Sequence, residues 1–158
     1  MYKTYTGGVI VLDVIEMIST MQTAFDNYKN ADDIDDVDRD DFPIVVMMHY
    51  ITSDIDSATL VAGQFVGRFI NRVHDWLTDD NHPLLHKAVG YHNDTKYEQC
   101  FNLLTAYMQG EALKTPDNVY LAFLIRATVC RFSGLSHYAE QTVSDLVQAG
   151  KIYLSKES

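Results

Sequence analysis

The chain has few cysteines, prolines and glutamates, and it has no long apolar run. Two cysteines, three prolines and five glutamates occur among 158 residues. No apolar stretch reaches the roughly 18 residues that a membrane-spanning helix needs. Met1–Thr4 do not begin a charged and then apolar segment, so we expect no secretory signal and a cytoplasmic location. We then expect Cys100 and Cys130 to be buried free thiols, with a disulfide between neighbouring helices as the alternative.

Sequence signatures of the common enzyme classes are also missing. The chain has no Walker A loop, no GxGxxG, HExxH, CxxC or GxSxG pattern, and no cluster of lysine and arginine. Its glutamates are scattered, which argues against the all-α nucleotide pyrophosphohydrolases with their paired glutamate motifs. We therefore expect no direct binding of nucleic acid, no cofactor and no catalytic residue.

What the chain has in excess is aspartate. The 22 acidic residues outnumber the 12 lysines and arginines, which gives a net charge of −10. Residues 1–80 hold 15 acids and 5 bases, whereas residues 81–158 hold 7 of each, so the first half carries the whole net charge. Such a surface repels nucleic acid and anionic membranes, and it attracts basic partners.

The highest charge density lies in residues 30–41, which we call the Asp-rich segment. Seven of its twelve residues are aspartate, and one is arginine. Because like charges repel one another, we expect a mobile loop. Ile34 and Val37 are the apolar residues that would attach this loop to the body of the protein.

Apolar periodicity predicts an all-α fold, a bundle of about six or seven helices in a single domain over residues 1–158. Its central helix is expected near residues 57–78, where apolar side chains recur at steps of three and four. Residues 43–51 are so apolar that they fit a helix or a buried strand. We favour a helix, because a lone strand would have no partner. A frayed tail is expected after Gly150.

Three local signals refine this prediction. Thr95 begins a T-x-x-E pattern, which is typical of a capping box at the start of a helix. Thr115 precedes a proline and predicts another helix start. Gly63 and Gly67 are one helical turn apart and predict the close approach of another helix. That helix is expected from the same chain, with a second copy as the alternative.

The first functional hypothesis is a non-enzymatic binding protein that docks on the basic surface of a partner protein. Basic surfaces commonly bind nucleic acid, so the protein would act as a nucleic-acid mimic or inhibitor. Small acidic viral inhibitors of host defence and transcription offer an analogy. The expected partner-binding residues are nine aspartates in the Asp-rich segment and before the central helix: Asp32, Asp33, Asp35, Asp36, Asp38, Asp40, Asp41, Asp54 and Asp56.

Two alternative hypotheses are kept. The first is a structural subunit of a homo-oligomer, such as a homodimer, that buries an apolar patch. The second is a metal-dependent hydrolase. His82 and His86 are one helical turn apart, and His74 with Asp75 would complete a site for a metal that binds hydroxide.

Overall fold

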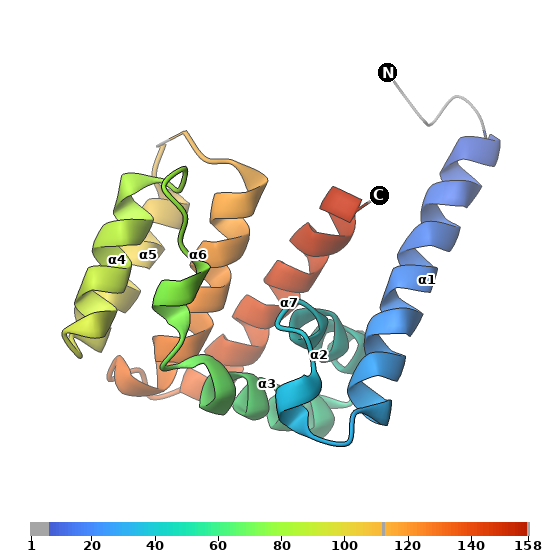
Figure 1. Cartoon of the computed structure of the whole chain (residues 1–158), viewed down its shortest axis with the longest axis horizontal. Coiled ribbons are helices and arrows are strands. Elements are labelled where there is room, and N and C mark those ends of the chain that lie inside the picture. The colour runs from blue at the N-terminus through green and yellow to red at the C-terminus, as the bar shows by residue number, and fades with distance from the viewer. Residues whose placement is uncertain (1–6, 112, 158) are drawn as a thin grey trace.

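Seven α-helices make up the fold of the computed structural model (Figure 1). The structure describes residues 7–111 and 113–157, and all regular structure in these ranges is helical. The α-helices are α1 (Gly7–Asn30), α2 (Asp41–Ile51), α3 (Ile55–Phe69), α4 (Pro83–Asn93), α5 (Tyr97–Gln109), α6 (Pro116–Val129) and α7 (Tyr138–Glu157). Three short 3-10 turns are η2 (Ile34–Asp36), η3 (Val73–Trp76) and η4 (Cys130–Phe132). The predicted all-α class is confirmed. Met1–Thr4, from which we expected no secretory signal, lie outside the described residues.

The first part of helix α2 is buried on all sides because its sequence has no polar face there. All six residues from Phe42 to Met47 are buried. A helix that is apolar all round needs neighbours on every side, and α1, α3 and α7 supply them. The preference for a helix over residues 43–51 is confirmed. The spacing of apolar residues did not distinguish a helix from a strand here. A helical or strand period in the sequence is visible only where polar residues mark one face of the element.

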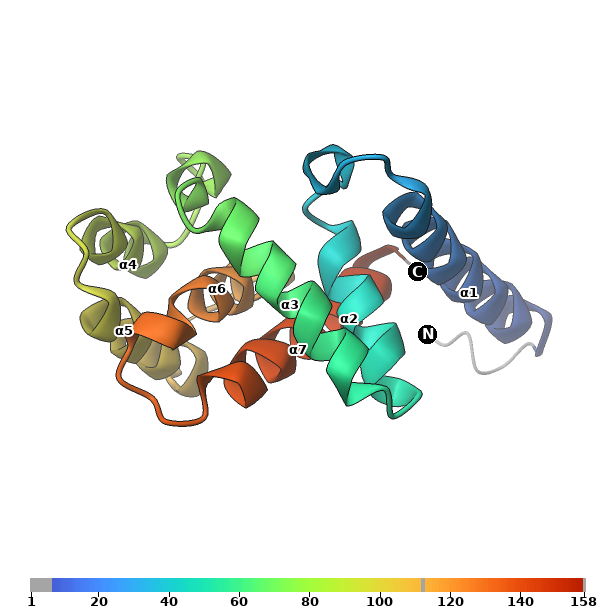
Figure 2. The same cartoon turned by 90° about the horizontal axis from the view of Figure 1, so that it is seen from below.

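Helix α7, and not the helix predicted near residues 57–78, lies at the centre of the molecule. It packs against α2 on one side and α6 on the other, and it also contacts α3 (Figures 1 and 2). At the crossing with α2, a Cβ atom on Gly150 would lie 2.8 Å from the carbonyl oxygen of Pro43. The helix continues through this glycine to Glu157, and Leu154 is buried. The helix end predicted at Gly150 is therefore wrong, whereas the fraying of the tail stays a prediction.

The segment predicted as one central helix is divided into two. Helix α3 ends at Phe69, residues 70–72 form a turn, and η3 follows. Trp76 still returns to the same apolar cluster, with its ring 6.0 Å from that of Phe65 and 5.7 Å from that of Phe69. The turn preserved the contacts that the spacing predicted, although it ended the helix.

Helices α4, α5 and α6 build the other side of the bundle, each packed on the next (Figure 1). Thr115 caps α6 as predicted, and its hydroxyl oxygen accepts the N–H of Asn118 at 3.2 Å. The capping box predicted at Thr95 is wrong. Thr95 has a φ of 59° and its hydroxyl donates to the carbonyl of Asp94 at 2.6 Å, so it belongs to the end of α4. Lys96 takes the cap position of α5 without a side-chain hydrogen bond.

Helix α1 packs on the bundle with its carboxyl-terminal half. Ala24 is buried there, and Met21 packs against the core. The amino-terminal half projects past the other helices (Figures 1 and 2). On this projecting half Val14, Ile15 and Ile18 are exposed.

Candidate functional site

The Asp-rich segment follows α1 and leads into α2, and a single arginine holds its backbone. Asp33 caps η2 by accepting the N–H of Asp35 at 3.0 Å. Arg68 of α3 donates to the carbonyl oxygens of Ile34, at 2.9 Å, and of Val37. Val37 is buried and Ile34 packs against the core, so the predicted attachment through these two residues is confirmed. The mobility of the segment stays a prediction.

A hollow lies on one side of the Asp-rich segment, between it and α1. Its volume is about 310 Å³. Seven residues line it: Asp26, Asn27, Asn30, Ala31, Asp36, Asp38 and Asp41. Four of these carry carboxylates, and among the described residues no lysine or arginine lines it. Burial raises the pKa of Asp41, the amide of Asn27 opposes the rise, and the nearby charges of Asp38 and Asp40 add to it.

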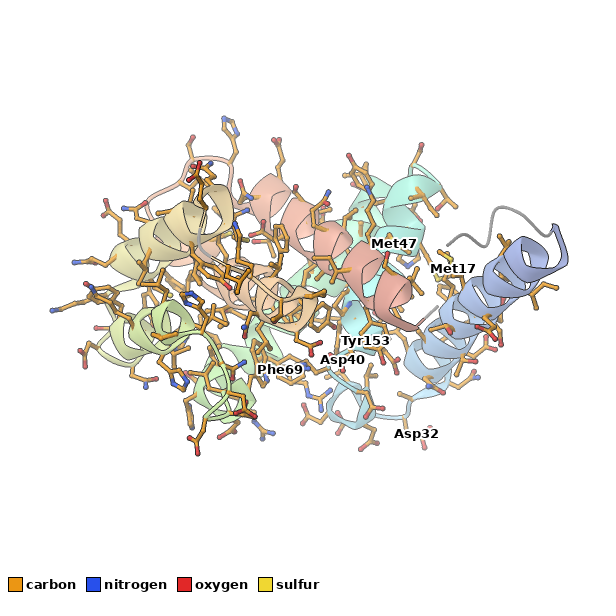
Figure 3. All side chains as sticks on the ribbon, turned by 90° about the horizontal axis from the view of Figure 1, so that it is seen from above. Met17, Asp32, Asp40, Met47, Phe69 and Tyr153 are labelled. Carbon is orange, nitrogen blue, oxygen red and sulfur yellow. The ribbon has the colours of Figure 1, made fainter. Side chains whose placement is uncertain are left out.

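A wider cleft of about 470 Å³ lies on the other side of the segment. Arg39 and Asp40 line it together with residues from η3, α6 and α7, among them the aromatic Trp76, Tyr120 and Tyr153. Figure 3 shows Asp40 beside Tyr153, whereas Asp32 lies away from them at the edge of the molecule. We call this second feature the aromatic cleft.

Arg39 and Asp40 form the centre of the aromatic cleft. The guanidinium carbon of Arg39 lies 5.2 Å from the ring centroid of Trp76 and 5.9 Å from that of Tyr120. Oδ1 of Asp40 accepts Nε of Arg39 at 2.9 Å and the hydroxyl of Tyr120 at 2.8 Å. Burial, with the Asp40 charge adding to it, raises the pKa of Tyr120 well above its usual value. Tyr120 therefore remains a hydrogen-bond donor to the carboxylate.

The structure brings together some of the nine predicted aspartates and separates others. Asp36, Asp38 and Asp41 meet at the hollow, and Asp40 faces the aromatic cleft. Asp32, Asp33 and Asp35 are exposed along the segment. Asp54 and Asp56 lie past the other end of α2, at the start of α3. The nine aspartates predicted to form one binding surface therefore lie in two separate places, the Asp-rich segment and the start of α3.

The distant pair has local roles of its own. Asp54 caps α3 by accepting the N–H of Ser57 at 3.1 Å, and it lies 3.9 Å from Nδ1 of His49. The hydrogen bonds from Ser57 lower the pKa of Asp54. Asp56 follows in the first turn of the same helix, where a carboxylate interacts favourably with the helix dipole.

The chain neutralises little of the charge of the Asp-rich segment. Arg39 pairs with Asp40 at 2.9 Å, and Nε of Arg68 lies 3.8 Å from Oδ1 of Asp35. The five other aspartates of the segment make no ion pair with any residue in the described ranges. Carboxylates in this state keep most of their attraction for external cations.

Sequence reasoning missed the residues that flank the Asp-rich segment. Asp26 was isolated within a helix, with no signal that it would face the segment. Trp76 falls in the stretch predicted as the central helix, with no signal that it would line a cleft. Tyr153 fell in the tail that was expected to be frayed. Tyr120 follows the helix start predicted at Thr115, and nothing in its local sequence indicated that it would lie at the wall of a cleft.

The structure does not bring the residues of the alternative metal site together. His74 and Asp75 are both exposed and contact each other, with Nε2 and Oδ1 3.2 Å apart. Nδ1 of His82 accepts the N–H of Leu84 at 3.1 Å, and Nε2 of His86 is 3.0 Å from the carbonyl of Thr78. Throughout the described part of the chain, no three His, Cys, Asp or Glu side chains are grouped so that they could hold a metal ion.

The two cysteines are buried free thiols, as predicted. Burial raises the pKa of Cys100 to about 12. Burial also raises the pKa of Cys130, and the charge of Asp145 adds to the rise. Both side chains are protonated near neutral pH, so neither is a thiolate nucleophile.

No protein-family model matches this sequence, and neither a curated protein nor a solved structure is significantly similar to it. Over the residues that the structure describes, no helix combines the length and the apolar character needed to cross a membrane. The geometry of the Asp-rich segment and its two hollows is therefore the evidence that bears on function.

Proposed function

We propose that this protein is a non-enzymatic binding protein whose Asp-rich segment docks on the basic surface of a partner protein. The main support is that five of its seven aspartates make no ion pair with the described residues of their own chain. Their charge is available to lysine and arginine side chains from outside. Protein surfaces that bind the phosphates of nucleic acid are also rich in lysine and arginine. The proposed partner is therefore a nucleic-acid-binding protein, and docking of this protein would compete with nucleic acid for the same surface.

The two hollows suit basic side chains of different shape. The hollow between α1 and the segment has carboxylates on several sides, which suits the compact ammonium group of lysine. The aromatic cleft has rings that attract a guanidinium group through the cation–π interaction, and the guanidinium of the chain's own Arg39 lies near two of them. The proposal also places the protein in the cytoplasm, where the thiols of Cys100 and Cys130 stay reduced.

The first prediction concerns the double variant Asp36→Asn/Asp38→Asn. Both side chains line the hollow and neither caps a helix, so the fold should be unchanged. Two exposed contacts contribute about 0.4–2 kcal/mol in total, so Kd should rise about 2- to 30-fold. The measurement uses the full chain on beads, the proteins that it retains from a host lysate, and elution with increasing salt. A partner of the proposed kind also leaves the beads when duplex DNA is added.

Asp54→Asn/Asp56→Asn is the matched control. It removes the same two charges, and asparagine still caps α3. Retention should be close to that of the unmodified chain, because these residues lie past the far end of α2. Equal losses from the two variants would point to net charge alone. Unchanged retention of the Asp36/Asp38 variant would contradict the proposal.

A further inference from the structure

An apolar groove lies between α3 and the start of α7. It differs from the acidic surface of the Asp-rich segment in its lining, which is mostly apolar. Its volume is about 330 Å³. Gly63 and Gly67 line it from α3, and Phe132 and Tyr138 line it from η4 and α7. A Cβ atom on either glycine would meet nothing within 4 Å. The prediction that another helix of the same chain packs closely on these glycines is therefore wrong.

The shape of the groove suits a helix. Two helices form its walls, and two glycines one turn apart leave room for the backbone of a third helix to approach closely. Phe132 and Tyr138 are exposed at 50% and 41%, and both line the groove, so a docked helix would cover apolar surface on two rings at once.

The projecting half of α1 carries an apolar face that no other part of the described chain covers. Val14, Ile15 and Ile18 are exposed at 47%, 54% and 58%. Met17 packs against the core, so Val14, Ile15 and Ile18 form an apolar face that is turned away from it, and Glu16 is the one charged residue between them. An apolar face of a helix is normally buried against another element.

Charge also matches between the two surfaces. Arg131 lines the groove, and its guanidinium carbon lies 6.0 Å from the ring centroid of Phe132. Glu16 is exposed on α1. Among the described residues neither side chain has an ion-pair partner, and each would supply one to the other.

We propose that the projecting half of α1 docks in the α3–α7 groove of a second copy of this chain. The projecting half of α1 cannot reach the groove of its own chain, because the other half of α1 is fixed against α2. Figure 2 shows α1 on the opposite side of α2 from the start of α7, which forms one wall of the groove. Reciprocal exchange about a two-fold axis fills both grooves and covers both helices, which closes the assembly as a dimer.

The dependence on salt concentration distinguishes this dimer contact from docking of the Asp-rich segment on a basic partner. Each copy carries a net charge of −10, so two copies repel each other at low ionic strength. Contacts between apolar side chains are not weakened by salt, and screening removes the repulsion. The dimer therefore becomes tighter as salt rises, whereas attachment of the Asp-rich segment to a basic surface becomes weaker. The two proposals stand independently.

Three variants test the arrangement by sedimentation velocity of the full chain. Ile15→Asp places a charge on the docking helix, and Gly67→Leu places a branched side chain in the groove, at a position where a Cβ atom meets nothing within 4 Å. Each should weaken the dimer about tenfold or more, and neither should lower the melting temperature. Leu60→Asp is the control. Leu60 is 62% exposed on α3 outside the groove, so this variant should remain a dimer.

Mixing the first two variants is the decisive step. The Gly67→Leu chain keeps an intact α1, and the Ile15→Asp chain keeps an intact groove, so the mixture should recover a heterodimer through one contact. Loss with Ile15→Asp alone would mean that α1 pairs with α1, and loss with Gly67→Leu alone would mean that another segment occupies the groove. Either result overturns the proposal, as does a wild-type chain that stays monomeric at about 100 µM at low and high salt. Asp36→Asn/Asp38→Asn should remain a dimer, which keeps failure here distinct from failure of the proposed function.

Discussion

Arg126→Met should lower the free energy of unfolding by about 3–5 kcal/mol, because it leaves a buried carboxylate without its cation. Arg126 of α6 donates from Nε and Nη2 to the two carboxylate oxygens of Asp145, at 3.1 and 2.7 Å. Its Nη1 also donates to Thr105 of α5 at 3.1 Å. Asp145 is fully buried on α7, so these bonds join three helices at the centre of the bundle. Urea unfolding of the purified chain measures the loss.

The same variant should make stability depend on pH. Burial raises the pKa of Asp145, and the hydrogen bonds and charge of Arg126 oppose the rise. Without Arg126 the pKa rises further, so the folded state keeps a proton that the unfolded state releases near its ordinary value of about 3.9. The free energy of unfolding then falls as pH rises from about 4 through the raised pKa, and the deficit is smaller in acid.

Arg72→Met is the control for this prediction, because Arg72 is exposed in the turn after α3. Its effect should stay within about 0.5 kcal/mol. A loss below about 1 kcal/mol for Arg126→Met, or a pH slope equal to that of the unmodified chain, would show that the pair with Asp145 does not hold the core together in the way described.

Gly150→Ala should destabilise the protein by about 2 kcal/mol, although alanine is the better helix former. The added methyl group would lie 2.8 Å from the carbonyl oxygen of Pro43 and 3.2 Å from Cβ of Met47. The first of these atoms belongs to the backbone of α2 and cannot rotate away, so α2 and α7 must move apart. Both helices belong to the core, and their separation exposes apolar surface.

Gly63→Ala makes the same chemical change where a Cβ meets nothing within 4 Å, and it should raise stability by about 0.5–1 kcal/mol. Thermal unfolding in dilute solution, where the chain is monomeric, compares the two variants. Opposite signs are the expected result. A neutral or stabilising effect of Gly150→Ala would contradict the close crossing of α2 and α7.

The helices could be predicted from sequence because most of them have an apolar stripe. Glycine, proline and cap residues indicated where many of them begin and end. Contacts between distant segments could not be predicted. Gly150 has the usual form of a helix end, and only the approach of α2 explains a glycine in the middle of α7. Trp76 continues the apolar period of α3, yet it reaches Phe65 and Phe69 from a separate turn.

For the candidate site, the sequence predicted which residues carry charge but not how they are grouped. Asp54 and Asp56 are close in sequence to the other aspartates, and α2 separates them from the Asp-rich segment. Asp26 joins the hollow because α1 runs beside the segment. The aromatic cleft combines four parts of the chain, so no local pattern could indicate it.

Trp76 has a practical consequence for work on the Asp-rich segment. It is the chain's one tryptophan, and the guanidinium of Arg39, next to Asp40, lies over its ring. Displacing this cation changes the electric field and the water around the indole, which shifts its emission. Intrinsic fluorescence of the unlabelled protein therefore reports directly on events at the segment, without an added dye and without a second tryptophan to obscure the signal.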